Sequence, residues 1–326
     1  MQTSIICPVF NTAPSLLTAA ASSLLDDRSP FLRQLILVDD ASDRPDTLSA
    51  LDALAAADPR VLLVHAPRNL GPAGARNLGL AAATEEWVGF LDADDVWLPE
   101  QPARLRRLAA AHPEASWFGV SHRLIDPNGS WRPARRLTCP VAKSLGGGVL
   151  RFEAPALTRI LLSDFLLHLG AMVVRRALVK QVGGFAEGLC YFEDFLFMAK
   201  LSTLTPLFYL GVDGYGWRRG GESLVTNPRR LDLSSLRMHR IAARDPALRD
   251  YRREIRWARY SAIKGLAVNN LLAGRRRRAL AIAVRGWTID PREVRDLLLF
   301  LRLWLRGSEE AGAAYSSTER FGARGA

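Results

Sequence analysis

The chain has 326 residues, of which 48% are hydrophobic, so it is long enough for one large domain with an appendage and apolar enough for a buried core. Its three cysteines, an odd and sparse set, argue against a disulfide-stabilised secreted scaffold, and no apolar stretch reaches the roughly 18–20 residues of a membrane span. The net charge of +11 is concentrated in residues 229–306, which hold 20 Lys and Arg against 7 Asp and Glu, whereas residues 1–228 hold 22 against 23.

Two apolar runs near the N-terminus predict buried strands. Residues 4–11 read SIICPVFN, a run in which Pro8 is expected to end the regular hydrogen-bond ladder and Asn11 suits the turn that follows. Residues 35–38 form a second run, rich in β-branched side chains, that leads into the acidic pair at 39–40. Both strands are therefore expected to place polar side chains in the loops behind them.

Helical and strand patterns alternate along the first 115 residues. We expect helices at 15–25, 47–57 and 103–115, a strand at 61–64, and a helix at 78–83 behind the loop GPAGARN at 71–77. This alternation predicts an α/β fold in which helices cover both faces of a mostly parallel sheet. Residues 128–160 are expected to be irregular, with a mobile loop at the triple glycine 146–148.

Three carboxylates, those of Asp92, Asp94 and Asp95, surround Ala93 directly after the apolar run at 87–91. Such a hard, oxygen-rich cluster suits Mg²⁺ or Mn²⁺. In an open α/β sheet, ligands bind just beyond the carboxyl ends of the strands, so the cluster has the position for a metal ion that grips a diphosphate. The alternative is a solvated acidic turn that caps the next helix.

A second acidic pair, Glu193 and Asp194, lies among aromatic residues in the segment YFEDFLF at 191–197. Partial desolvation disfavours the charged form of a carboxyl group and so raises its pKa. A carboxylate with a raised pKa suits a general base. The alternative is that Asp194 is the N-cap of a helix predicted at 195–203.

Residues 229–306 predict a basic α-helical module, and residues 307–326 a disordered tail. Helices are expected at 231–244, 247–272, 276–288 and 291–306. The last of them alternates leucines with arginines, and such a basic amphipathic helix can lie on an anionic membrane surface. The alternative is a helical bundle packed on the catalytic domain with a solvated basic face. No nucleic acid is expected as a partner, because the arginines accompany no recognised nucleic-acid motif.

Five motifs in this order resemble the family 2 glycosyltransferases of the GT-A fold: SIICPVFN, VDDASD, RNLGPAGARNLGLAAA, FLDADDVW and FEDF. The resemblance covers roughly residues 1–225 and implies a catalytic domain at 1–228. It implies an inverting enzyme that uses Mn²⁺ or Mg²⁺ to move a sugar from a nucleoside-diphosphate donor, with a UDP-sugar favoured. The acceptor would be a hydroxyl of a glycan or lipid-linked molecule in cell-surface polysaccharide or glycolipid synthesis.

The odd, sparse set of cysteines indicates a reducing compartment and hence a cytoplasmic enzyme, and the basic helices could bring it to the inner face of the cell membrane. Two alternatives remain open. One is a non-catalytic GT-A scaffold or sugar-nucleotide-binding protein, which would be expected to lack Asp94 or Asp194. The other is a nucleotidyltransferase, which would need a basic glycine-rich loop after the first strand, where residues 11–14 read NTAP.

The resemblance also implies roles for individual acidic residues. Asp94 is the first choice for metal ligand, and Asp92 would act through the metal or the ribose. Asp194 would be the general base. Asp40 would accept a hydrogen bond from the nucleotide base, with Asp39 as the alternative, and a carboxylate in that place does not choose between uracil and guanine.

The remaining candidates follow from the same motifs. The nucleotide-sugar site implied by the resemblance includes, besides these acidic residues, Pro8, Phe10, Asn11, Arg68, Gly74, Arg76, Ala93 and Arg218. For Arg68 a place on the surface at the start of a helix is an equal alternative. Arg218 belongs to residues 215–223, which resemble the late arginine loop of the family and could close over the diphosphate. Glu193 and His168 are candidates for the acceptor side, although a lone histidine is more often structural.

Overall fold

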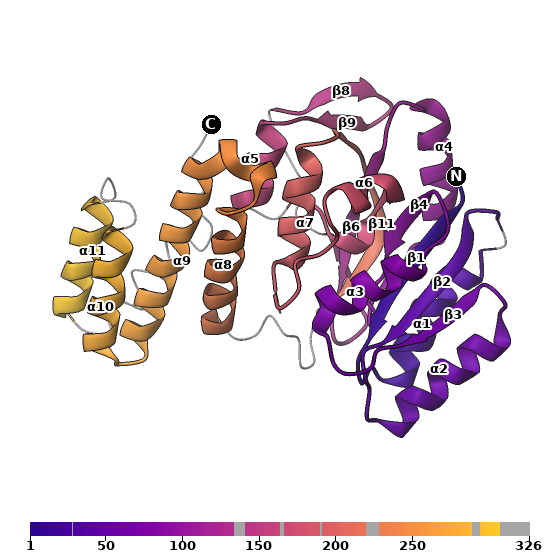
Figure 1. Ribbon diagram of the computed structural model, residues 1–326, viewed down its shortest axis with the longest axis horizontal. Helices are drawn as coiled ribbons and strands as arrows, with labels where there is room; N and C mark the ends of the chain where they lie inside the picture. The colour runs from indigo at the N-terminus through magenta and orange to yellow at the C-terminus, as the bar shows by residue number, and fades with distance from the viewer. Residues whose placement is uncertain are drawn as a thin grey trace. The chain divides into compact units, whose positions relative to one another are not determined.

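The computed structural model describes residues 1–27, 29–133, 141–163, 166–189, 191–219, 228–288 and 294–306. The chain divides into two compact units. The first comprises Met1–Leu161 and Phe165–Ser223, and the second comprises Leu162–Asp164 and Leu224–Ala326. Figure 1 labels most of the helices and strands of both units.

One 11-stranded sheet forms the centre of the first unit within the described residues. The strands along its main path run in the order β3-β2-β1-β4-β10-β6-β11-β9-β8, with β5 paired to β11 and β7 to β6. Their bounds are β1 Thr3–Val9, β2 Leu32–Asp39, β3 Val61–His65, β4 Trp87–Phe90, β5 Val96–Trp97, β6 Trp117–Ile125, β7 Trp131–Pro133, β8 Lys143–Gly146, β9 Val149–Phe152, β10 Met172–Arg175 and β11 Leu207–Arg218.

Helices pack on this sheet as the alternating pattern predicts (Figure 1). They are α1 Pro14–Leu25, α2 Pro45–Ala57, α3 Gly71–Ala82, α4 Gln101–Ala111, α5 Ala156–Ser163, the 3₁₀ helix η1 Leu169–Ala171, α6 Arg176–Gln181 and α7 Glu193–Ser202. Helices α1 and α2 contact each other, whereas α3 packs on β1 and β2. Because parallel crossovers are right-handed, a chain that runs outward through β1, β2 and β3 and then returns to β4 places α1 and α2 on one face and α3 on the other.

The strand order creates a topological switch point beside β1. Strand β1 pairs in parallel with both β2 and β4, and the chain direction across the sheet reverses between those neighbours. The loops behind these carboxyl ends diverge there, which is where open α/β sheets bind ligands. Beyond β4 the sheet is mixed, since β10 is antiparallel to both of its neighbours and β6 is parallel to β11.

Helix α3 begins earlier than the sequence predicts. The segment GPAGARN, expected to be a loop, forms its first two turns, so the predicted start at residue 78 is wrong. The backbone of Gly71 has a φ of +73°, which makes the turn into the helix, and Pro72 occupies an early position where a missing N–H costs nothing. Gly79 lets the helix approach β1, because a Cβ there would lie 2.5 Å from Cγ2 of Ile6.

Two further expectations are corrected in the strands. Strand β1 continues through Pro8, which pairs with Val38, because the ladder between β1 and β4 has already ended at Ile6 and no N–H is needed there. The predicted irregular region at 128–160 contains β7, β8, β9 and most of α5. The triple glycine 146–148 forms the tight turn between the antiparallel strands β8 and β9, and all three glycines have a positive φ.

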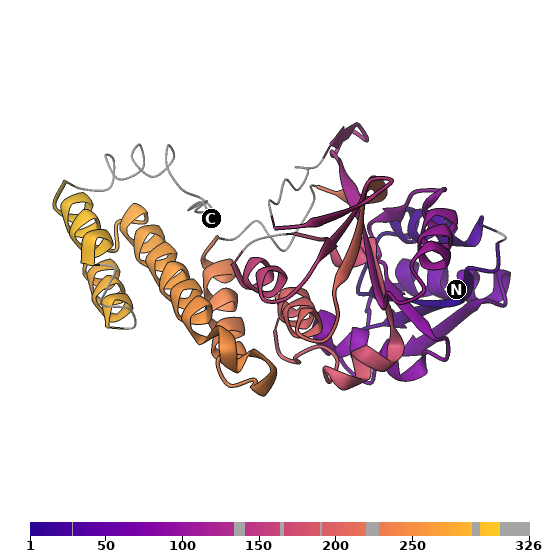
Figure 2. The ribbon, with the colours of Figure 1, turned by 90° about the horizontal axis from the view of Figure 1, so that it is seen from above.

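The second unit is helical, as its sequence predicts. It contains α8 Pro228–Ala242, the 3₁₀ helix η3 Pro246–Tyr251, α9 Arg252–Leu272, α10 Arg276–Trp287 and α11 Val294–Arg306. Helices α8, α9 and α10 pack as consecutive neighbours, and α11 packs on α10. Figure 2 shows α10 and α11, in yellow, from a second direction. The expected disordered tail at 307–326 lies outside the described residues.

Helix α11 uses part of its apolar face inside this unit. Phe300 is buried in a cluster with Ala267, Leu271 and Ala279. Nε1 of Trp304 donates a hydrogen bond of 2.9 Å to the carbonyl oxygen of Arg276. These contacts show that part of the apolar face of α11 packs within the helical unit, while membrane contact stays a prediction.

Within the described residues, no helix is both long enough and apolar enough to cross a membrane.

Candidate active site

The acidic turn behind β4 lies at the switch point of the sheet. Ile6 of β1 pairs with Phe90, and the chain then turns through Asp92–Asp95 into β5. Asp92 is half-buried, Asp94 is exposed and Asp95 is only 1% exposed. The three carboxylates therefore meet different environments although they share one turn.

Arg76 of α3 is the central cation of the site. Its guanidinium donates one hydrogen bond to Oδ1 of Asp92 and one to Oε1 of Glu193, and each is 2.7 Å long. The side chain of Arg76 is almost fully buried. The ring of Phe185 lies 5.6 Å from the guanidinium carbon. Burial opposes the charge of Arg76, but the neighbouring carboxylates outweigh it and raise the pKa of the guanidinium above its ordinary value. This network joins the turn behind β4 to the start of α7.

Asp194 lies in the first turn of α7 and is half-buried. Burial first, and then the charge of Glu193, raise the pKa of its carboxyl group to about 7, although Arg76 opposes the shift. The helix begins at Glu193, and its N-cap is Phe192, whose left-handed backbone has a φ of +66°. The alternative in which Asp194 is the N-cap is therefore wrong; its Oδ1 accepts a hydrogen bond from the N–H of Phe195.

Asp95 lies behind the turn and is held by β11. Its Oδ2 accepts a 2.7 Å hydrogen bond from the hydroxyl of Tyr215, and its Oδ1 accepts one of 2.7 Å from the backbone N–H of Arg218. Burial and the charges of Asp92 and Asp94 raise the pKa of this carboxyl group well above its ordinary value. Residues 215–218 thus belong to a strand rather than to the predicted loop, and residues 220–223 lie outside the described part.

Asp94 faces solvent beside Arg218. The crowded turn still desolvates its carboxyl group enough that burial and the charge of Asp92 raise its pKa, while Arg218 opposes the shift. Arg218 is half-buried, and its Nε is a buried donor with no hydrogen-bond partner among the described residues. An anion at this edge would satisfy that donor.

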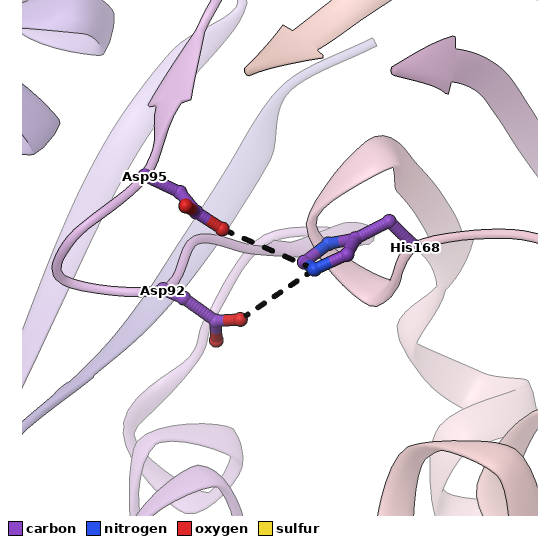
Figure 3. A group of neighbouring side chains, drawn as sticks. All are labelled: Asp92, Asp95 and His168. Atoms are coloured by element: carbon purple, nitrogen blue, oxygen red, sulfur yellow. Dashed lines mark ion pairs between the residues drawn. The ribbon is translucent and has the colours of Figure 1, made fainter. Parts of the chain in front are cut away.

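His168 approaches the turn from the segment before η1. Its Nε2 lies 4.0 Å from Oδ2 of Asp92 and 3.9 Å from Oδ2 of Asp95, as Figure 3 shows. The ring stacks on Tyr215 at 4.7 Å between centroids. Burial lowers the pKa of His168 to about 4, so the imidazole is neutral at neutral pH. Gly170 makes this stack possible, because a Cβ there would lie 2.2 Å from the tyrosine ring.

Asp92, Asp95 and His168 together are a candidate metal site, since their nearest ligand atoms lie within 4.8 Å of one another. The imidazole fits this role poorly: its Nδ1 accepts a 3.2 Å hydrogen bond from the N–H of Gly170, which leaves the proton on Nε2. The Nε2–H then faces the two carboxylates at 3.9 and 4.0 Å, which is too long for a direct hydrogen bond. The hard oxygens of Asp92 and Asp94 fit Mn²⁺ or Mg²⁺ without this conflict.

The acidic pair behind β2 organises the neighbouring loops. Asp40 accepts hydrogen bonds from the N–H groups of Leu70 and Gly71, at 2.6 and 2.9 Å, and so fixes the start of α3. Burial opposes ionisation of Asp39, but its hydrogen bonds to Ser42 and His65 outweigh it and lower its pKa. Burial raises the pKa of Asp40. Their role at the nucleotide base stays a prediction.

The other predicted contacts surround this edge unequally. Phe10 is 51% exposed behind β1, whereas Pro8 is half-buried and Ala93 buried. Asn11 spends its side chain on the loop after β2, where its Oδ1 accepts from the N–H groups of Asp43 and Arg44. These hydrogen bonds give Asn11 a structural role that is independent of any contact with the donor.

Two more predicted contacts belong to the approach to α3. Arg68 is exposed, as its surface alternative expects. Gly74 is a packing residue, because a Cβ there would lie 2.6 Å from that of Leu70. The structure thus gives Gly74 a reason to be glycine that does not depend on a ligand.

Sequence reasoning missed two residues that assemble the site. Asn77 exchanges 2.9 Å hydrogen bonds with the backbone N–H and carbonyl of Phe185, which fixes the turn before the segment that carries Glu193. Its position directly after Arg76 was the available signal. Tyr215 falls within the loop predicted at 215–223, and no local pattern connects it with Asp95, 120 residues earlier.

Comparisons with known proteins identify the family. The profile described as Glycosyl transferase family 2 matches residues 4–182. The succinoglycan biosynthesis protein ExoO of Rhizobium meliloti is 39% identical over 103 residues, 32% of this chain and 27% of that protein. ExoW of the same organism is 28% identical over 202 residues, 59% of this chain and 61% of that protein. The chain thus spans only part of the length of these curated relatives.

Solved structures show the same fold. The S. aureus TarS fragment 1–349 in complex with UDP superposes with a TM-score of 0.63 at 18% identity, covering 98% of this chain and 92% of that one. The complex of the same fragment with UDP-GlcNAc gives a TM-score of 0.58 at 19% identity, covering 90% and 92%. The family profile covers more than half of the chain, so the predicted fold and enzyme class are confirmed: this protein belongs to glycosyltransferase family 2 and is a glycosyltransferase with the GT-A fold.

Proposed function

We propose that this glycosyltransferase moves a sugar from a UDP-sugar, with inversion, to a hydroxyl of a glycan or lipid-linked acceptor in cell-surface polysaccharide synthesis. The named relatives act in succinoglycan biosynthesis, and the TarS fragment binds UDP and UDP-GlcNAc. The observation that carries the proposal is Asp194, a half-buried carboxylate with a pKa of about 7 beside the acidic edge of the sheet. Such a group exchanges a proton readily near neutral pH.

In the proposed reaction the acceptor hydroxyl attacks the anomeric carbon of the donor. Its oxygen forms the new glycosidic bond, Asp194 takes its proton, and the bond from the anomeric carbon to the diphosphate oxygen breaks. The electron pair leaves with the nucleoside diphosphate. Attack from the face opposite the leaving group inverts the anomeric centre.

The leaving diphosphate needs positive charge. Asp94 and Asp92 would hold Mn²⁺ or Mg²⁺, which would neutralise the charge that develops on the departing oxygen. Arg218 would supply a second positive group from β11, since its Nε has no partner among the described residues. Arg76 has a different task in this proposal: its two ion pairs hold Asp92 and Glu193 in place, so it orients the site rather than binding donor.

His168 would fix the carboxylates instead of the metal ion. Its neutral ring presents Nε2 to Asp92 and Asp95, and Nδ1 is already an acceptor for Gly170. The residues that would bind the metal ion are therefore different from those that hold the carboxylates in place. The exposed carboxylate of Asp94 would meet the metal ion and the donor, whereas Asp95 and His168 are buried.

A thermal-shift screen tests the proposal. The full chain is heated with UDP, GDP, dTDP or CMP, each with Mn²⁺ and with EDTA. A ligand at 100 times its dissociation constant adds about 2.7 kcal/mol to the free energy of unfolding, which is readily measured. A metal-dependent shift with UDP supports the proposal. A shift with another of these nucleotides instead of UDP would mean that the donor sugar is carried by that nucleotide. The absence of any shift favours the alternative of a non-catalytic scaffold.

A further inference from the structure

The helical unit contains a groove between α8, α9 and α10 that the transfer reaction does not use. Its volume is about 550 Å³, enough for an alkyl chain with a small head group. Its apolar lining consists of Leu233, Leu236, Ile263, Leu266 and Ile282. All of these residues belong to the second unit, so the groove is complete within it.

Four arginines line the same groove: Arg240, Arg259, Arg278 and Arg285. Among the described residues, none of these four guanidinium groups forms an ion pair, and no Asp or Glu lines the groove. In a folded protein, several arginines beside apolar side chains without a carboxylate are an unbalanced arrangement, because like charges repel. The groove therefore has the charge of a site for an anion.

Two buried polar atoms in the groove lining lack partners. Nε of Arg259 is a buried donor with no hydrogen-bond partner among the described residues, and Oδ1 of Asn270 is a buried acceptor in the same state. Asn270 is 2% exposed, and its Nδ2 donates to the carbonyl oxygen of Leu266 over 2.8 Å. Burial and the nearby charge of Arg240 lower the pKa of Arg259, so a bound anion would relieve a real electrostatic cost.

A second hollow of about 350 Å³ adjoins this arrangement through Arg259. It is lined by Ala243, Arg252, Ile255, Arg256 and Arg259. Arg252, Arg256 and Arg259 follow one another at helical spacing along α9, so their side chains emerge on one face. The positive charge thus continues from the apolar groove into a polar pocket around a shared arginine.

We propose that this groove binds an anionic amphiphile, with a phosphate group on the arginines and an alkyl or prenyl chain along the leucines. The arginines match phosphate oxygens in charge and geometry, and the leucine-lined floor removes the chain from water. The site differs from a basic membrane-facing helix because it takes one molecule at a time. It does not depend on the donor or on Asp194.

Calorimetric titration of the full chain tests the site with three probes. Decyl phosphate below its micellar concentration carries both the head and the chain, decyl glucoside carries the chain with a neutral head, and inorganic phosphate carries the head alone. We expect saturable binding of decyl phosphate, at least tenfold tighter than that of either other probe. Equal binding of inorganic phosphate, or no binding of decyl phosphate, would overturn the proposal.

Matched variants separate the groove from the general basicity of the unit. Arg240→Gln with Arg285→Gln removes two exposed groove arginines, and Arg253→Gln with Arg277→Gln removes two exposed arginines that do not line it. We expect the first pair to weaken decyl phosphate about tenfold and the second pair less than twofold. Equal weakening by both pairs would contradict a specific site, and unchanged melting temperatures confirm that the variants fold.

The apolar floor has its own matched pair. Leu233 is 49% exposed in the groove, and Leu272 is 38% exposed outside it. Leu233→Ser should weaken decyl phosphate about threefold to fivefold while leaving inorganic phosphate unaffected, and Leu272→Ser should change neither. If Leu233→Ser leaves decyl phosphate binding intact, the chain does not occupy the groove.

Discussion

The two units differ in how the charges of their arginines are compensated. In the first unit, Arg76 is buried between Asp92 and Glu193, and Asp95 accepts hydrogen bonds from Tyr215 and the backbone. In the second unit, the groove arginines have no carboxylate partner among the described residues. The difference teaches that the acidic edge of the sheet is preorganised by its own network, whereas the basic groove is left unbalanced until a ligand arrives.

The largest effect should come from the proposed base. Asp194→Asn keeps the size of the side chain and removes the proton acceptor, so transfer should fall by about 10²–10⁴-fold. Binding of UDP with Mn²⁺ should stay within about twofold of the wild type, because the proposed base would face the acceptor rather than the metal or the nucleotide. Initial rates of sugar transfer and calorimetric donor binding, measured on the same preparations, check both parts. Normal turnover in the variant would remove Asp194 from its assigned role.

Removing the central cation should cause the next largest effect. Arg76→Gln leaves the carboxylates of Asp92 and Glu193 without their ion partner, which should lower the free energy of unfolding by about 3–5 kcal/mol. Urea denaturation measures it. The control is Arg68→Gln, an exposed arginine whose loss should change stability by no more than about 0.5 kcal/mol. Equal stability of the two variants would mean that the network does not hold the site together.

The support of Asp95 should contribute less. Tyr215→Phe removes only the hydroxyl that donates to Oδ2 of Asp95, so a buried acceptor loses a partner. We expect a loss of about 1–3 kcal/mol in the free energy of unfolding, again by urea denaturation. Donor binding should weaken only slightly, since the hydroxyl lies behind the metal-binding oxygens. A stabilised variant would argue against this hydrogen bond.

The pH dependence follows from the same base. Because the pKa of Asp194 is about 7, the deprotonated form needed for catalysis is lost as pH falls below that value. Turnover under saturating donor should therefore drop about tenfold per pH unit below 7 and level off above it. The raised pKa also means that ionisation of Asp194 costs folding free energy as pH rises from about 4 through 7. Asp194→Asn should accordingly lose less stability than the wild type between pH 5 and pH 8.

The smallest effect on stability is expected for an arginine of the groove in the second unit. Arg285→Gln removes an exposed groove arginine that has no ion partner among the described residues, so stability should change by no more than about 0.5 kcal/mol. Thermal melting with and without decyl phosphate measures it. A loss of several kcal/mol in the free energy of unfolding would show that Arg285 already stabilises the fold. The groove arginines would then not be reserved for a ligand.

Local patterns predicted the elements better than their exact starts. The strands that lead to Asp39 and Asp92 can be recognised in the sequence as apolar runs, because a buried parallel strand needs apolar side chains on both faces. The predicted start of α3 is wrong, because Gly71 and Pro72 resemble a loop until Asp40 is known to accept hydrogen bonds from the N–H groups of Leu70 and Gly71. A cap supplied from 30 residues away leaves no local signal.

The site shows the same limit. The carboxylates Asp92, Asp94 and Asp194 could be chosen from motifs, but their different environments could not. Asp95 is buried because Tyr215, 120 residues later, passes over Gly170 to reach it. Contacts of this kind depend on the tertiary structure alone, so the sequence predicts which residues gather and the structure decides which of them are charged, paired or exposed.

The most direct test of the account is calorimetric titration of UDP into the full chain, with Mn²⁺ and with EDTA, for the wild type and for Asp94→Ala. The account predicts UDP binding that requires the metal in the wild type and is lost in the variant, because the exposed carboxylate of Asp94 would hold the ion that binds the diphosphate. Equal, metal-independent binding by both proteins would contradict the claim that the acidic edge of the sheet is the donor site.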